Sequence, residues 1–188
     1  MSGQLDIVMN LLRQVQLFSE LPKAELELMG ETVAGEMLVP SLPGEWRPAL
    51  EAVAKASRAT FLNHPWLLPA LQGVPAVTPN LLRHIEQSSQ AVAGLAGQGV
   101  DPTLLQGIVV AVDDYTIGFT LRELASGGHV ERGRRFEARF ADPNVRYLIE
   151  SGEFPLLERF LAGGVQAPIA SFERGLAWLL DGFAAQID

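Results

Sequence analysis

The segment at residues 102–125 constrains the fold more than any other part of the sequence. Its central stretch, LLQGIVVAVDDYTIGFTLREL, contains no proline and is apolar on nearly every side. A helix of this composition is typically buried all round. A chain of 188 residues that left it at the surface would expose a large apolar patch. We therefore expect other helices, or a second copy in a two-fold dimer, to enclose it.

Helical periodicity also dominates the rest of the chain, and strand-like alternation is scarce. Proline after a capping side chain, at Thr78-Pro79 and Asp101-Pro102, predicts two helix starts, and glycine pairs predict helix ends. The predicted helices span residues 5–18, 22–37, 46–63, 65–71, 78–96, 102–125 and 171–187, with two or three short helices between 129 and 164. Short linkers favour antiparallel neighbours, so the sequence predicts an all-α antiparallel bundle of about 8–10 helices.

The composition limits the cellular setting. No window approaches ~18 uninterrupted apolar residues, so we expect no membrane span and no membrane partner. The first residues, MSGQLDIVMN, lack the basic and apolar regions of a secretory signal, which predicts a cytoplasmic location. The chain has no cysteine, which excludes disulfides and thiolate metal sites.

The charge balance argues against direct nucleic-acid binding. The chain has 14 basic and 22 acidic residues, for a net charge of −8, whereas phosphate contacts need clustered Lys and Arg. The densest basic stretch, HVERGRRFEARF, is interrupted by Glu131 and Glu137. We interpret it as a solvated helix face.

Two adjacent acids, Asp113 and Asp114, occur in the most apolar helix. A buried carboxylate without a partner is costly, so an arginine such as Arg58, Arg83 or Arg122 should pair with either one if it lies inside. The alternative is that the pair anchors a ligand or acts as a general base. The sequence does not show which of the two is buried.

A polar stripe marks the helix predicted at residues 78–96. His84, Gln87 and Ser88 lie three and four positions apart and share one face. Such a stripe is either an ordinary solvent-facing surface or the polar side of an apolar ligand cavity. Aromatic residues form either a cavity wall or plain core: Trp66, Tyr115 and Phe119.

No strong catalytic or metal-binding signature is present. The three histidines, at 64, 84 and 129, form neither an HxxxH nor an HExxH pair, and no GxSxG motif occurs. We therefore expect no metal and no cofactor. If the chain is an enzyme, His84, Asp113 and Asp114 are the candidate acid and base groups.

Three segments, in this order, resemble a known family. They are WRPALEAVAKASRATFLNHPWL (residues 46–67), VDDYTIGFTLRE (112–123) and SFERGLAWLLDGF (171–183). They are similar to the C-terminal domain of TetR family transcription regulators, in the branch near the tetracycline repressor. The segment at residues 21–37 also resembles that family's linker helix. The likeness covers most of residues 22–188.

The resemblance implies a ligand-binding and dimerisation domain at residues 22–188. We predict one helix within residues 1–21, in place of the family's DNA-binding helix-turn-helix head. Either that head has been lost or it lies outside the given sequence, and we favour loss. The implied ligand is a small hydrophobic or aromatic molecule in the bundle. The implied ligand residues are His64, Trp66, His84, Gln87, Ser88, Asp114, Tyr115 and Phe119.

The resemblance also implies a homodimer in which the long apolar helix and the last helix of two subunits form a four-helix bundle. The expected interface residues are Phe172, Leu176, Leu179, Leu180 and Phe183. Two other functions stay open. The chain is either an enzyme that converts a hydrophobic metabolite on a reused TetR-like scaffold, or a ligand-free dimerisation partner of a full-length regulator.

Overall fold

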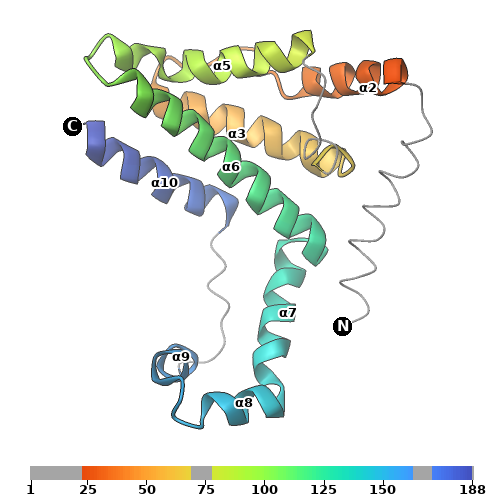
Figure 1. The fold of residues 1–188 in the computed structure, drawn as a ribbon, viewed down its shortest axis with the longest axis vertical. Helices are drawn as coiled ribbons and strands as arrows, with labels where there is room; N and C mark the ends of the chain where they lie inside the picture. The colour runs from red at the N-terminus through yellow and green to blue at the C-terminus, as the bar shows by residue number, and fades with distance from the viewer. Residues whose placement is uncertain (1–22, 69–77, 163–170, 188) are drawn as a thin grey trace.

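The computed structural model describes residues 23–68, 78–162 and 171–187. These parts contain eight helices and no strand, which confirms the all-α prediction (Figure 1). The helices are α2 (Lys23–Glu36), α3 (Trp46–Asn63), α5 (Pro79–Ala96), α6 (Pro102–Ser126), α7 (His129–Ala141), α8 (Pro143–Ile149), α9 (Pro155–Leu161) and α10 (Phe172–Ile187). The helix predicted at residues 5–18, the proposed boundary at residue 21 and residues 69–71 of the helix predicted at 65–71 lie outside the described residues.

Local signals set the helix ends where the sequence predicts them. The Thr78 hydroxyl accepts a hydrogen bond from the Leu81 N–H and caps α5, and the Asp101 carboxylate accepts from the Thr103 N–H at the start of α6. Gly127 ends α6 with φ 76°, a left-handed conformation that glycine adopts without strain. The Ser171 hydroxyl accepts from the Arg174 N–H at the start of α10.

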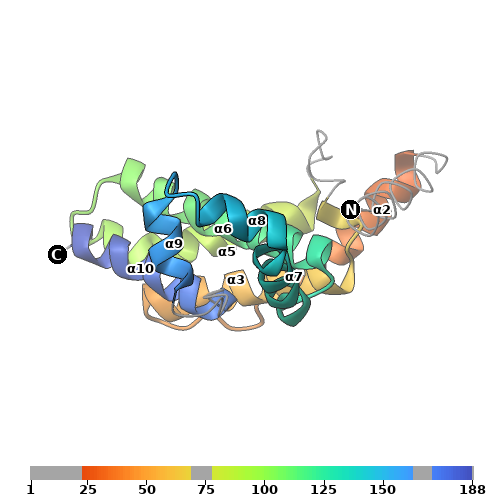
Figure 2. The ribbon, with the colours of Figure 1, turned by 90° about the horizontal axis from the view of Figure 1, so that it is seen from below.

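The body of the molecule is formed by α3, α5, α6 and α10, with α2 beside α5 (Figures 1 and 2). Its main core joins α3, α5, α6 and α10, and the side chains of Leu50, Ile108, Phe172 and Leu180 are at most 1% exposed. A second cluster joins α2 to the far end of α3: Val33, Met37, Phe61, Leu67 and Leu68.

Helix α6 is buried along one stripe and not all round. Its buried residues recur every three or four positions: Leu105, Ile108, Val112, Thr116, Thr120 and Glu123. Val110, on another side, is 52% exposed. Within the described residues, α6 is also long and apolar enough to cross a membrane by length and composition alone. The expectation that α6 is enclosed on every side therefore fails for a single chain.

Helices α7, α8 and α9 leave the end of α6 and extend away from the body as an arm (Figure 1). Its apolar side chains are poorly covered: Val130 is 70% exposed, Tyr147 77%, Leu156 67% and Phe160 81%. No residue of α9 is buried. A helix of seven residues is unstable on its own, so the arm needs more cover than the described part of one chain supplies.

Candidate ligand-binding site

A small internal hollow lies among α3, α5 and α6. Its volume is about 10 Å³, which is room for about one water molecule. Its polar lining comes from Ser57 on α3, His84 and Ser88 on α5, and Asp113 and Thr116 on α6. Its apolar lining consists of Leu50, Val53, Ala54, Val109 and Val112. Half of the lining residues are thus polar, whereas the usual small-molecule site is mostly apolar with a few polar groups that orient the ligand.

The three hydroxyl groups of this lining are held by the backbone of their own helices. Ser57, Ser88 and Thr116 each donate to the carbonyl oxygen four residues earlier, at 3.0, 3.0 and 2.7 Å. Each proton is therefore engaged, and each oxygen retains lone pairs that can accept a hydrogen bond. Toward the hollow, these hydroxyl groups can therefore act only as hydrogen-bond acceptors.

His84 is the most unusual member of the lining. His84 is only 7% exposed. Its Nδ1 atom is buried and has no hydrogen-bond partner in the described part of the chain. Burial lowers the pKa of His84 below its ordinary value of 6.5, so the imidazole is neutral at physiological pH. An unpaired buried polar atom is rare in native structures and calls for an explanation.

Asp113 contributes the charge of the site. The residue keeps contact with solvent, but enough protein surrounds its carboxyl group for desolvation to raise the pKa, and the negative charge of Asp114 raises it further. Among the described residues, neither aspartate forms an ion pair. Arg58, which we considered as their partner, binds Glu123 instead.

Gln87 shares a helix face with His84 and Ser88 but has a structural partner. Its Oε1 accepts from the Val39 N–H at 3.0 Å, and its Nε2 donates to the Val39 carbonyl at 2.8 Å. Both ends of the amide thus fasten the connector between α2 and α3 to α5.

His64 and Trp66 lie at a separate place, a groove of about 350 Å³ beside α2. The Nε2 atom of His64 is 2.8 Å from the Glu36 carboxylate, and the His64 and Trp66 rings are 6.3 Å apart at a steep angle. The structure does not bring these two residues to the hollow among α3, α5 and α6.

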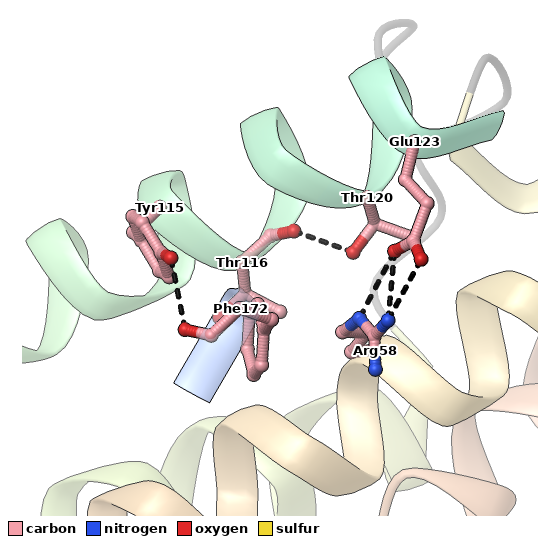
Figure 3. A network of polar contacts seen from close by, with 6 residues as sticks. All are labelled: Arg58, Tyr115, Thr116, Thr120, Glu123 and Phe172. Carbon is pink, nitrogen blue, oxygen red and sulfur yellow. Dashed lines mark hydrogen bonds and ion pairs between the residues drawn. The ribbon is translucent and has the colours of Figure 1, made fainter. Parts of the chain in front are cut away.

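Tyr115 and Phe119 belong to an aromatic cluster between α6 and α10. The Tyr115 hydroxyl donates to the Phe172 carbonyl at 2.9 Å, and the two rings stack at 5.4 Å (Figure 3). Phe119 lies 5.5 Å from the Phe172 ring. Asp114 is exposed and is not part of the hollow's lining. Of the eight ligand residues expected from the sequence, the structure gathers only His84 and Ser88 in this hollow.

Next to the hollow, a buried ion pair ties α3 to α6. Arg58 binds both carboxylate oxygens of Glu123 at 2.8 to 3.1 Å (Figure 3). The Arg58 guanidinium also lies 5.1 Å from the Phe172 ring centre, which is a cation–π contact to α10. Sequence reasoning missed this pair, as it missed Ser57 and Thr116. Ser57 and Thr116 could have been found from the sequence, because each is a hydroxyl residue on an otherwise apolar helix stripe.

The residues expected at the subunit interface lie mostly inside the chain's own core. Phe172 and Leu176 are each 1% exposed and Leu180 is 0% exposed, while Leu179 and Phe183 are partly buried against the same core. The large side chain on another face of α10 is Trp178, which is 62% exposed. The interface itself stays a prediction. In the described residues, no group of three or more His, Asp or Glu side chains is arranged to hold a metal ion.

The all-helical bundle agrees with the class of helical domain indicated by the sequence motifs. Residues 39–187 match the family model described as the tetracyclin repressor-like C-terminal domain. The chain belongs to this TetR-type family, which confirms the resemblance seen in the sequence.

Two relatives show how far the likeness extends. The chain is 28% identical over 142 residues to the HTH-type transcriptional repressor DrrR1 of Streptomyces coeruleorubidus, covering 74% of this chain and 52% of that protein. It therefore spans about half the length of this curated relative. A solved structure of a possible TetR family transcriptional regulator from Streptomyces coelicolor A3(2) superposes with a TM-score of 0.58 at 28% identity, covering 87% of this chain and 76% of that one.

Proposed function

We propose that this chain is a ligand-sensing regulatory domain of TetR type and that the hollow among α3, α5 and α6 is its ligand site. The observation that carries the proposal is that His84 lines this hollow and has a buried Nδ1 atom without a hydrogen-bond partner among the described residues. Such an atom lowers the stability of the fold. A bound molecule that hydrogen bonds to it would remove this penalty, which gives the atom a function.

Ligand binding at this place requires the hollow to widen. Sites for small organic molecules usually measure about 300 Å³ or more, whereas this hollow measures about 10 Å³. A ligand therefore has to select or induce a form in which α5 or α6 is displaced. Helix displacement on binding is what a sensor needs in order to signal.

We also propose that the domain forms a homodimer. The observations in support are the exposed apolar side chains Val110 on α6, Trp178 on α10 and Phe160 on the arm. Large exposed apolar side chains on a long apolar helix and on the last helix are surfaces that a subunit contact would cover. A second copy would cover the same surface on both subunits at once.

In this proposal the domain acts in transcription regulation through ligand and subunit contacts, in the cytoplasm. The relative DrrR1 is named an HTH-type transcriptional repressor. This chain has a net charge of −8, which disfavours binding to phosphate. We propose that DNA contact is made by a partner such as a full-length regulator and not by the described helices.

The test is native mass spectrometry of the protein purified from its own host, with two histidine variants. We expect a copurified small molecule in the wild type and in His64→Leu, whose ring lies at the other groove. We expect His84→Leu to lose the molecule while keeping or gaining thermal stability, because the unpaired nitrogen is gone. A bound molecule retained in full by His84→Leu would contradict the proposed site.

An enzyme remains the second candidate because His84 and Asp113, two side chains able to transfer a proton, line the same hollow. Chemical change of the copurified molecule, abolished in His84→Ala without loss of affinity, would favour the enzyme. Loss of affinity alone would favour the sensor.

A further inference from the structure

We infer that the hollow among α3, α5 and α6 takes a molecule with a protonated amine on an apolar body, its ammonium group lying between the Asp113 carboxylate and the unpartnered ring nitrogen of His84. The inference rests on the proposed function, because it assigns a chemical class to the ligand of that same site.

The charge of the lining selects the sign of the ligand. Asp113 is the charged side chain of the lining, and no Lys or Arg among the described residues lines the hollow. The neighbouring arginine, Arg58, is engaged by Glu123. An anionic ligand would meet an uncompensated carboxylate, whereas a cation would be attracted to it.

The hydrogen-bonding character of the lining points to a ligand rich in donors. The hydroxyls of Ser57, Ser88 and Thr116 donate their protons to backbone carbonyls. They can therefore act toward a ligand only as hydrogen-bond acceptors. A neutral imidazole offers one further acceptor nitrogen. An ammonium group carries three donors and no acceptor, so it matches this lining. A carbonyl-rich ligand would leave most of these acceptors unpaired.

The remaining walls define the body of the ligand. They consist of aliphatic side chains from α3 and α6, among them Leu50, Val53, Val109 and Val112. When the helices separate to admit a ligand, an apolar ligand body that packs against these walls keeps them out of water, which is favourable. The ligand class is therefore an amphiphile with one cationic head and a compact hydrophobic or aromatic body.

The experiment compares three probes that share one ring system: naphthylmethylamine, naphthylmethanol and naphthoate. Each is titrated calorimetrically into the full chain at neutral pH. We expect the amine to bind at least about tenfold more tightly than the alcohol, which is the effect of one charge-assisted hydrogen bond. We expect the carboxylate to bind most weakly.

Two aspartate variants give a matched control. Asp113→Asn removes the carboxylate that lines the hollow, and Asp114→Asn removes the same charge from the next residue, which does not line it. We expect Asp113→Asn to abolish the preference for the amine and leave alcohol binding intact. Asp114→Asn should keep the preference within about twofold, because the Asp114 side chain does not line the hollow.

The outcomes separate the ligand class from the site. Equal binding of amine and alcohol, with both reduced in His84→Leu, would overturn the amine inference and leave the ligand site standing. Equal loss of preference in Asp113→Asn and Asp114→Asn would also overturn it. Absence of saturable binding by all three probes would overturn the site and the inference together.

Discussion

Arg58 on α3 binds both carboxylate oxygens of Glu123 on α6. The Glu123 side chain is 9% exposed and that of Arg58 is 24% exposed, so the pair is shielded from water on most sides. Because Arg58 also covers the ring of Phe172, one guanidinium holds three helices together. The hollow lies beside this junction, since Ser57 precedes Arg58 and lines it.

The first prediction concerns this pair. Glu123→Gln should lower the free energy of unfolding by roughly 2 kcal/mol, because it leaves a partly buried guanidinium without its counter-ion. The coupling is measured by urea unfolding in a double-mutant cycle with Arg58→Met, at fixed protein concentration. The exposed pair of Lys55 and Glu51 is the control, and its coupling free energy should be at most about 0.5 kcal/mol. Equal coupling in both cycles would contradict the structural role given to Arg58.

The second prediction concerns the close approach of α10 to Tyr115. A Cβ atom at Gly175 would lie 2.9 Å from Tyr115 Cζ and closer still to its hydroxyl oxygen. Gly175→Ala should therefore cost roughly 1 to 3 kcal/mol of stability from overpacking. Gly182 on the same helix has nothing within 4 Å of the added atom, so Gly182→Ala should stabilise by roughly 0.5 to 1 kcal/mol. Thermal unfolding of both variants checks the contrast, and identical effects would argue against the contact.

The third prediction concerns Gln87. Gln87→Leu removes both hydrogen bonds to Val39 and should destabilise the protein by roughly 1 to 3 kcal/mol. Since the amide points to the connector, ligand affinity per folded molecule should stay unchanged. Calorimetric titration and chemical unfolding of the same preparation distinguish the two effects. A stable variant with weakened ligand binding would place Gln87 in the ligand site instead.

The fourth prediction is a pH dependence of stability due to His84. Burial lowers its folded pKa below 6.5, so below about pH 6.5 the unfolded chain binds more protons than the folded one. Stability should fall as the pH drops from 6.5 toward the folded pKa, with a slope of at most about 1.4 kcal/mol per pH unit, and should be independent of this group above that range. Urea unfolding between pH 5 and 8 measures the slope.

The matched variant for that measurement is His84→Gln, which should flatten the curve. The groups that face His84 across the hollow are Ser57 and Thr116, which do not titrate in this range, and Asp113. The raised pKa of Asp113 acts in the opposite direction, since protonation of that carboxyl favours the folded state. An unchanged slope in His84→Gln would assign the dependence to another group.

The fifth prediction tests the subunit contact. Trp178→Glu places a charge on the exposed face of α10 and should shift sedimentation from dimer to monomer, because a buried unpaired charge opposes association. Leu28→Glu, at a residue of α2 that is 67% exposed, is the control and should leave the assembly unchanged. A wild-type protein that sediments as a monomer at all tested concentrations would rule out the proposed dimer.

The helices were predictable because their signals are local. Thr78-Pro79, Asp101-Pro102 and Gly127-Gly128 specify helix ends through hydrogen bonds and dihedral angles within a few residues. The site was not predictable to the same degree. Whether Gln87 faces the hollow or the Val39 backbone depends on where the connector lies, which no helical periodicity encodes.

The pairing of charges shows the same limit. The sequence offers Arg58 three carboxylates on one helix, Asp113, Asp114 and Glu123, and their order along the chain does not rank them. The choice depends on the rotation and crossing of α3 and α6, which bring the buried stripe of α6 against α3 at the position of Arg58. Glu123 continues that stripe from Thr116 and Thr120, whereas the two aspartates are exposed.

At the corner between α6 and α7, two consecutive glycines have φ values of 76° and 106°. Side chains with a Cβ atom are strained in both conformations. The backbone angles of Gly127 and Gly128 thus set the direction in which the arm leaves α6. Residues further along α7 to α9 do not take part in this corner. Replacing either glycine would strain the backbone at this corner, whereas replacing a residue further along the arm would leave the corner unstrained.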